Sequence, residues 1–398
     1  MVQIFQTETL ATGSRKIEVV KLFLIKADLM EIIEVTNKRL LNLFLDAPAD
    51  ILEKYPHYIV PIRSNVKDTL DPRKNPLWQV ADRKLYVALK DGKPVGTIAA
   101  IYHSQHILHN PEDAAYFGYL HFEEDHEILR ALIRTAKSFA REKNVKALIG
   151  PFNPSLNYEL GILTDGFEYD PFFMMNYNPP YYPALMEKED GKIVMQFLAY
   201  HYQQGVNLAK IERVTRQLKS RYDVKIEDIN FKKFDTEAYE LCDVYNDAFE
   251  GHFGFVPFSK GEFLFLAKSL RLILDRQLLF KVKLKDDTAG FMLTIPDINS
   301  AVRKLQNGRF NAWNILKFVY RLRKIKSSKV MLIAIRKRYQ KLGLGSILYN
   351  EMNLRTQKAG YLQGEISWVA EENNKMHKIV QSIGAQPYKK YAVYRFEI

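Results

Sequence analysis

The stretch that decides the fold reads Val330-Met-Leu-Ile-Ala-Ile335 and continues as Arg336-Lys-Arg-Tyr-Gln340-Lys-Leu-Gly343-Leu-Gly345-Ser346. Its first six residues are apolar and predict a buried strand. Four bases and two glycines follow, and the apolar spacing of Ser346–Lys358 predicts a helix directly after them. Glycines let backbone N–H groups approach a phosphate, and a helix N-terminus adds a positive field. The segment therefore predicts a cradle for a pyrophosphate.

Three kinds of corner share this outline. A Rossmann site requires a third glycine where this chain has Leu348, and a Walker loop requires a Gly-Lys-Ser/Thr that is absent at the needed spacing. A plain strand–loop–helix corner stays open on these residues alone.

Gln340-x-x-Gly343-x-Gly345 resembles motif A of the GCN5-related N-acetyltransferases. The strand Leu362–Val369, a helix over Asn373–Ser382 and the tyrosine-rich strand Lys389–Glu397 resemble the rest of that fold, so the resemblance covers about Ile226 to Ile398. Segments of the first half, such as Gly150-Pro151-x-Asn153-Pro154, resemble a bacterial two-domain family of the same fold.

The resemblance implies acetyl-CoA or a longer acyl-CoA as donor and no metal. Backbone groups of Ile333, Ala334 and Ile335 would meet the pantetheine and the thioester oxygen, where an N–H stabilises the oxyanion. Asn373 would lie near the pantetheine arm. The expected pyrophosphate seat comprises Gln340, Lys341, Leu342, Gly343, Leu344, Gly345 and Ser346.

The acceptor amine must lose a proton before it attacks, so a carboxylate is expected nearby. Glu365 and Glu371 are the candidates, although Glu371 and Glu372 also suit the N-terminus of the next helix. Many family members carry a tyrosine acid where this chain has Val380, so we expect Tyr391, or else Tyr388 or Tyr394, to replace it.

The first half repeats the outline of hairpin, strand, helix and strand. Its elements are expected at Lys84–Lys90, Val95–His103, Ala114–Phe122, Asp125–Lys143 and Val145–Ile149. The corner between the third strand of this outline, Ala114–Phe122, and its helix carries four acids and no glycine over 122–127, so it would repel a pyrophosphate. We predict tandem acyl-CoA N-acyltransferase folds of the α/β class, with mixed, mostly antiparallel sheets flanked by helices. The expected division is a degenerate copy (1–200), a linker helix (201–225) and an acyl-CoA-binding domain (226–398).

The charge is unevenly distributed. Residues 1–200 carry a net charge of −3 and residues 201–398 carry +15. An insert between Ile295 and Val330 combines nine bases with four aromatic residues. An RNA surface, a helix in contact with an anionic membrane, and a packed helix with Ile315, Phe318, Val319, Leu322 and Ile325 inward all fit that composition. No nucleic-acid motif accompanies it, so we do not expect a nucleic-acid partner.

Loops of the first half are candidates for acceptor binding, since asparagine, proline and tyrosine often line pockets. The same residues are common in plain turns. The predicted acceptor-binding residues are Asn153, Asn157, Asn178, Tyr181 and, from the second half, Trp368.

The single cysteine, Cys242, excludes a disulfide framework, and the nine histidines show no zincin spacing. The first 24 residues mix acids and bases unlike a signal peptide, so a cytoplasmic protein is expected. We predict an N-acyltransferase, most simply an acetyltransferase, that acts on a primary amine. The alternatives are a long-chain enzyme that acts on a lipidic amine, as bacterial ceramide synthase does, and a CoA-binding module without catalysis.

Overall fold

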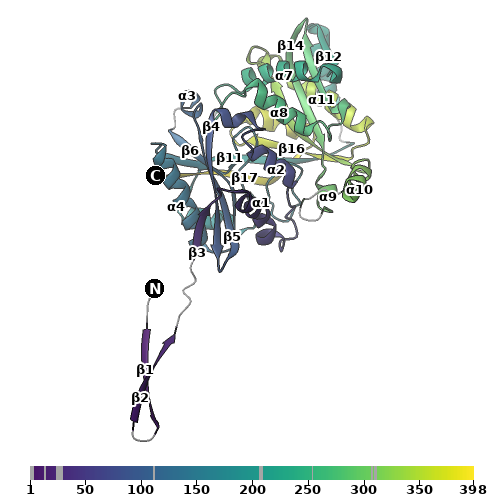
Figure 1. The fold of residues 1–398 in the computed structure, drawn as a ribbon. Coiled ribbons are helices and arrows are strands. Elements are labelled where there is room, and N and C mark those ends of the chain that lie inside the picture. The colour runs from purple at the N-terminus through teal and green to yellow at the C-terminus, as the bar shows by residue number, and fades with distance from the viewer. Residues whose placement is uncertain are drawn as a thin grey trace.

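The computed structural model describes residues 4–12, 15–23, 30–110, 113–205, 209–252, 254–305, 308 and 312–398. At the N-terminus β1 (Ile4–Thr12) and β2 (Arg15–Phe23) pair as an antiparallel hairpin (Figure 1). The main sheet joins both halves of the chain, with the first half around β4 to β6 and the second around β12 to β14 at its two ends (Figure 1).

The first half contains the elements β3 (Met30–Glu34), α1 (Lys38–Leu52), α2 (Arg63–Leu70), β4 (Ala81–Lys90), β5 (Lys93–His103), α3 (His106–His109), β6 (Ala114–Phe122), α4 (His126–Glu142), β7 (Ala147–Gly150), β8 (Phe152–Asn153), β9 (Glu159–Leu160), β10 (Ile162–Asp165), α5 (Tyr181–Lys188) and β11 (Lys192–Gln203). The second half contains α6 (Ala209–Arg221), β12 (Val224–Asp228), α7 (Phe234–Phe249), α8 (Lys260–Leu270), β13 (Leu279–Leu284), β14 (Asp287–Pro296), α9 (Asn299–Val302), α10 (Ala312–Leu322), β15 (Ser327–Ile335), α11 (Leu344–Lys358), β16 (Gln363–Ala370), α12 (Asn374–Ser382) and β17 (Gln386–Glu397). The predicted outline of hairpin, strand, helix and strand occurs in each half.

The strand order is β12-β13-β14-β15-β16-β11-β17-β7-β6-β5-β4-β3, with β10 beside β17. Only β15 with β16, and β6 with β7, pair in parallel within this sheet of the described residues. The predicted mixed, mostly antiparallel α/β fold is confirmed. The sequence analysis expected separate sheets, whereas the structure has one continuous sheet.

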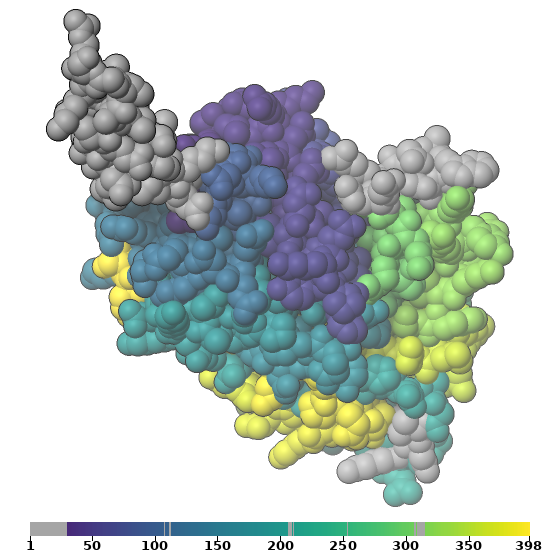
Figure 2. All heavy atoms as spheres, turned by 90° about the horizontal axis from the view of Figure 1, so that it is seen from below, coloured from purple at the N-terminus to yellow at the C-terminus, as the bar shows by residue number. Residues whose placement is uncertain are grey.

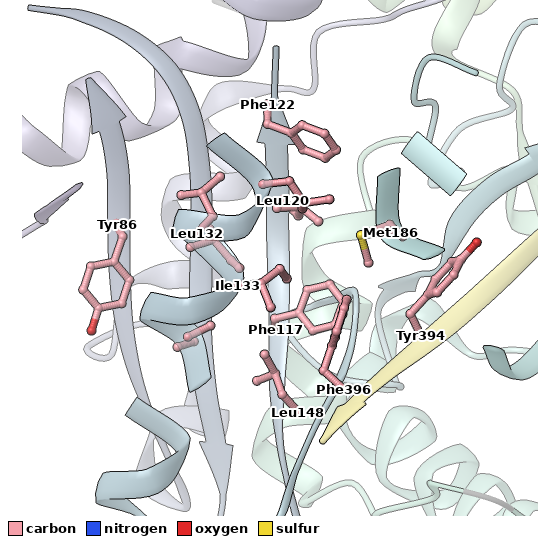
Figure 3. Packing of buried hydrophobic residues seen from close by; sticks show 14 of the residues in the cluster. Tyr86, Phe117, Leu120, Phe122, Leu132, Ile133, Leu148, Met186, Tyr394 and Phe396 are labelled. Atoms are coloured by element: carbon pink, nitrogen blue, oxygen red, sulfur yellow. The ribbon is translucent and has the colours of Figure 1, made fainter. Parts of the chain in front are cut away.

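The sheet is continuous because the halves exchange their last strands. β11 ends the first half but pairs with β16 of the second, and β17 ends the second half but pairs with β7 of the first. Figure 3 shows Phe396 of β17 beside Phe117 of the first half, and Tyr394 of the same strand belongs to the same core cluster. Tyr200 and Tyr202 of β11 lie in the core beneath α11. Each half therefore completes the core of the other.

Helices cover both faces of the sheet. In the first half α4 and α1 pack on opposite faces of β5, and in the second half α11 and α7 cover opposite faces of β14 and β15. α6 packs against α11, and the expected linker region 201–225 also contains the end of β11 and the start of β12.

One of the alternatives for the insert, the packed helix with five apolar residues inward, holds only in part. Phe318 is buried and Leu322 and Ile325 pack beside it, but Ile315 and Val319 are exposed. The apolar spacing was correct, but the neighbours of the helix cover only one part of its apolar surface.

Candidate acyl-transfer site

β15 and β16 separate in the middle of the second half. They pair in parallel from Ser327 and Gln363 to Val330 and Ile366, where the register ends. Beyond that point β15 stays paired with β14, and β16 stays paired with β11. A wedge therefore opens between residues 331–335 and 367–370. In this wedge, backbone groups on the facing strand edges lack a ladder partner and are available to a bound group.

Three residues predicted to meet the donor lie on the β15 side of the wedge. Ile333 and Ile335 pack toward the core beneath α11, whereas Ala334 packs toward α7. The side chains are thus used in packing, and only the backbone of this stretch is left to contact a ligand.

The predicted cradle follows β15 directly. A 3-10 helix over Lys337–Leu342 leads to Gly343, whose φ of 82° lies in the left-handed region that glycine tolerates. α11 begins at Leu344, two residues before the predicted start, so Gly345 and Ser346 form part of its first turn. The first N–H groups of a helix lack partners within it and attract anions.

The bases of the cradle are largely paired within the chain. Lys337 Nζ lies 2.7 Å from Glu250 Oε2, Arg338 lies 2.5 Å from Asp287 Oδ2, and Arg336 Nε donates to the Thr288 carbonyl at 2.9 Å. The sequence analysis treated these side chains as full charges available to the phosphates. Their acidic partners reduce that field, so the backbone N–H groups and Lys341 matter more.

Gln340 and Asn373 have local partners. Gln340 Nε2 donates to the carbonyls of Ile335 at 3.1 Å and Ala248 at 3.3 Å, and so braces the cradle against β15 and α7. The Asn373 side chain caps α12 by accepting from Met376 N–H at 3.1 Å. Both residues shape the site through the backbone.

Glu365 is fully buried at the last pairs before the wedge. Ser367 Oγ donates to one of its oxygens at 2.5 Å, and the Tyr388 hydroxyl donates to the other. Lys389 Nζ lies 3.7 Å from the same carboxylate. Glu371, by contrast, is exposed in the turn after β16, where its N–H donates to the Gln196 carbonyl. Of the two candidate bases, Glu365 is therefore the one that is buried and hydrogen-bonded at the wedge.

Lys329 stands beside Glu365 in the parallel register and is 1% exposed. Its Nζ donates to the Met174 carbonyl at 3.1 Å and lies 4.6 Å from the centre of the Trp368 ring. Burial lowers the pKa of Lys329 to about 8, although Glu365, Glu159 and Asp297 oppose the shift. Burial likewise raises the pKa of Asp297 to about 6. The buried cluster thus contains groups that titrate near neutral pH.

Tyr391 and Trp368 each have a buried hydrogen-bond donor without an acceptor among the described residues. The Tyr391 hydroxyl and the Trp368 indole N–H are buried and lack a hydrogen-bond partner within the described part of the chain. Their rings lie 6.4 Å apart. An unsatisfied buried polar group costs about 1–3 kcal/mol, so both are suited to a bound group that accepts hydrogen bonds.

The site spans the two halves. The first half supplies the Glu159 carboxylate near Lys329. It also supplies two carbonyl groups: that of Met174 accepts from Lys329 Nζ, and that of Asp170 accepts from Lys389 Nζ at 2.7 Å. Met175 places its sulfur 3.2 Å from Ser367 Oγ. The wedge belongs to the second half, whereas the cluster beneath it is shared.

Two solved structures show the same fold. A tandem GNAT protein from the clavulanic acid biosynthesis pathway matches with a TM-score of 0.54 at 13% identity, over 92% of this chain and 98% of that chain. The GCN5-related glucosamine N-acetyltransferase region of a fungal multi-domain β-N-acetylglucosaminidase matches with a TM-score of 0.57 at 14% identity, over 94% of this chain and 38% of that chain.

Among curated proteins, a protein of Caulobacter vibrioides named bacterial ceramide synthase is 30% identical over 376 residues, which cover 92% of this chain and 97% of that protein. The chain belongs to the GCN5-related N-acetyltransferase superfamily, as a tandem member. It is an acyl-CoA-dependent N-acyltransferase, as the sequence predicted. Protein YghO of Escherichia coli is 27% identical over 91% of this chain and 94% of its own length. No family model matches the chain.

The first GNAT copy has the same wedge in closed form. β6 and β7 pair only from Ala114 and Ala147 to Tyr116 and Ile149. A Cβ added at Gly118 would lie 1.8 Å from the Phe152 carbonyl oxygen, and Asn153 Oδ1 accepts from Tyr119 N–H at 2.6 Å. The segment after β7 therefore fills this wedge. Asp125 caps α4 by accepting a hydrogen bond from Glu127 N–H.

The predicted acceptor residues of the first GNAT copy are engaged within the chain. The Asn178 side chain accepts from Leu163 N–H and donates to the Leu163 carbonyl. Asn157 accepts from the Tyr245 hydroxyl and donates to the Val256 carbonyl. The Tyr181 hydroxyl donates to the Phe122 carbonyl. A cavity beside Asn153 and Asn178 has a volume of about 40 Å³. That volume suits a water molecule or two and is too small for an acceptor amine.

Sequence reasoning missed Lys329, Lys389 and Asp297. Lys329 was counted among the solvated bases of the insert, although it directly precedes a run of apolar strand residues. Glu365 precedes Ile366 in the same way, and two opposite charges at the starts of neighbouring buried strands were the available signal. Cys242 is a buried core thiol, and burial raises its pKa to about 12.

Proposed function

We propose that this enzyme transfers a long-chain acyl group from acyl-CoA to the primary amine of a lipidic acceptor. The observation that carries the proposal is the 30% identity, over nearly the whole of both chains, to a protein named bacterial ceramide synthase. The proposal places the reaction in the cytoplasm, where acyl-CoA is available, and includes peripheral contact with an anionic membrane as the source of the acceptor. No helix of the described residues has the length and apolar character to span a bilayer.

The donor would lie along the wedge of the second half. The backbone from Leu342 to Ser346 would hold the pyrophosphate, and the backbone of Ile333 to Ile335 would face the pantetheine and the thioester. A backbone N–H of this edge is suited to the oxyanion that forms when the amine attacks. Asn373, at the start of α12, would flank the pantetheine arm.

Glu365 is proposed as the proton acceptor. Both oxygens of Glu365 accept hydrogen bonds, one from the Ser367 hydroxyl and one from the Tyr388 hydroxyl. The acceptor amine would therefore pass its proton to Ser367 while Ser367 passes its own proton to Glu365. Trp368, between Lys329 and Tyr391, would line the acceptor side.

Tyr391 has a more limited role than the sequence analysis gave it. Burial and the nearby Glu365 raise its pKa well above the ordinary value. Proton transfer from this hydroxyl to a thiolate of pKa near 8.5–10 is therefore uphill. We propose that Tyr391 donates a hydrogen bond to the reacting group instead of giving up its proton.

Turnover across a panel of donors and acceptors tests the proposal. Acetyl-CoA and a long-chain acyl-CoA are each combined with small polar amines and with long-chain amines dispersed in detergent, and the free CoA thiol is followed. We expect release only when both partners are long. Reaction of acetyl-CoA with small polar amines alone would contradict the lipidic acceptor. Binding of acyl-CoA without release under any pairing would favour the non-catalytic module.

A further inference from the structure

α10 presents apolar side chains to the outside on one face. Ile315, Leu316, Val319 and Tyr320 are 46%, 66%, 47% and 60% exposed. Ile315 with Val319, and Leu316 with Tyr320, are spaced four residues apart, so the four side chains form one stripe. A surface helix of a globular protein ordinarily turns polar residues to this side.

A different face of α10 attaches it to the protein. Phe318 is 7% exposed and belongs to a cluster with Ile298, Val302, Leu322 and Ile325. Ile59 and Ile62 of the first half join the same cluster. In Figure 2 the light green insert lies at the margin of the molecule, beside the purple segment that contains α1 and α2. The four side chains of the stripe therefore do not contribute to the described packing that attaches α10 to the protein.

Positive charge continues from the stripe. Arg321, Arg323, Lys324 and Lys326 follow it, and residues 298–350 contain no acidic residue. Lys324 Nζ lies 4.6 Å from the centre of the Tyr320 ring, so base and apolar stripe share one surface. Apolar side chains next to bases are the pattern of helices that lie in the headgroup region of an anionic bilayer.

We propose that the stripe of α10, together with the basic turn over 321–326, is a peripheral docking surface for an anionic lipid bilayer. RNA fits this surface less well, because single-stranded nucleic acid gains chiefly from stacking on aromatic rings, and among the four exposed side chains of the stripe Tyr320 alone offers one. Phe318 is buried in the cluster, and three exposed aliphatic side chains gain nothing from phosphates. They do gain from transfer into the acyl boundary of a bilayer.

The surface is connected to the shared cluster of the site. Phe173 packs into the cluster beneath α10, and its N–H donates to Asp297 Oδ1 at 2.9 Å. The next residue, Met174, accepts from Lys329. Docking through α10 would hold the seam between the halves close to the membrane, which serves the lipidic acceptor of the proposed function. The docking itself does not depend on that function.

Co-sedimentation of the full chain with lipid vesicles tests the proposal. We expect binding to phosphatidylcholine vesicles that contain roughly 30 mol% phosphatidylglycerol, and much weaker binding to phosphatidylcholine alone. The double variant Leu316→Gln/Val319→Gln should lose roughly tenfold in binding. Arg323→Gln/Lys324→Gln should lose affinity and much of the salt dependence. The control Leu354→Gln removes an equally exposed apolar residue from α11 and should bind as the wild type does.

Activity on detergent-dispersed amine separates this proposal from the proposed function. The α10 variants should keep that activity while losing vesicle binding. Absence of vesicle binding by the wild type, or equal binding by the Leu316→Gln/Val319→Gln variant, would overturn the docking surface. Tight binding to single-stranded poly(U) that only the base substitutions weaken would also overturn it, in favour of a nucleic-acid surface.

Discussion

At the scale of single residues, the site depends on a buried group of charged side chains around Lys329 and Glu365. Lys329 and Glu365 occupy matching positions on the two parallel strands, one step before the strands part. Both are buried, and Lys389, Glu159 and Asp297 surround them. Removing one partner of a buried pair leaves an uncompensated charge, so such pairs respond strongly to substitution.

Glu365→Gln should lower kcat by roughly a hundredfold or more, because the amide cannot accept the proton that Ser367 relays. Steady-state kinetics with a long-chain donor measure it. Glu371→Gln is the matched control, since Glu371 is exposed, and should change kcat little. A larger effect at Glu371 than at Glu365 would reverse the two assignments.

Lys329 should make stability depend on pH. Its pKa is near 8 in the folded protein and near 10.5 when unfolded, so between these values the unfolded chain holds more protons. The wild type should therefore become more stable relative to Lys329→Met as pH rises through this window, by up to about 3 kcal/mol. Urea unfolding of both proteins at about pH 7.5 and about pH 10, which roughly bracket this window, measures the difference in the free energy of unfolding. A constant difference would show that Lys329 is not buried as a titrating amine.

At the scale of elements, the cradle joins β15 to α11 through a single left-handed residue. Gly343 has a φ of 82°, and the helix starts with the very next residue. The acidic partners of Lys337 and Arg338, and the Thr288 carbonyl that accepts from Arg336, leave the backbone as the principal anion-binding group of this element.

Gly343→Glu should abolish acyl-CoA binding, since it adds a carboxylate and backbone strain where the pyrophosphate is expected. Isothermal titration calorimetry with acyl-CoA measures it. Gly92→Glu is the matched control: Gly92 has a φ of 77° and open space around it, but lies in the β4–β5 turn. Unchanged binding in Gly343→Glu would move the donor away from the cradle.

At the scale of the whole molecule, the exchanged strands make the two halves interdependent. β17 carries Tyr391, Tyr394 and Phe396 between β11 and β7, and these side chains are fully buried. Part of the first core therefore comes from the last residues of the chain.

Phe396→Ala should destabilise the protein by about 3–5 kcal/mol, through the cavity it leaves beside Phe117 in the first core. Hydrogen exchange should quicken in β6, β7 and α4 before it quickens in α11. Leu354→Ala, at a half-exposed site, is the control and should cost little. Faster exchange confined to the second half would contradict the interdependence.

The sequence predicted most of the elements and the form of the cradle, because those follow from local pattern. An apolar run of six residues, a basic glycine turn and helical spacing identify strand, cradle and helix over 330–358 without reference to the rest of the chain. The acids over 123–127 likewise predict that the first copy does not hold a phosphate. The sequence could not predict which strand each strand pairs with, because an alternating or apolar pattern indicates only which faces of the strand are buried.

The sequence by itself determined the α/β class, the duplicated outline and the strand, turn and helix in which the donor cradle is proposed. Only the tertiary structure decided that β11 and β17 exchange places, because hydrogen-bond partners in a sheet are chosen by distant strands. It also decided that Lys329 is buried beside Glu365 while Ile315 and Val319 are exposed. The physical reason is the same in each case: local spacing sets which residues share a face, and only the packing of the other half determines whether that face meets protein or solvent.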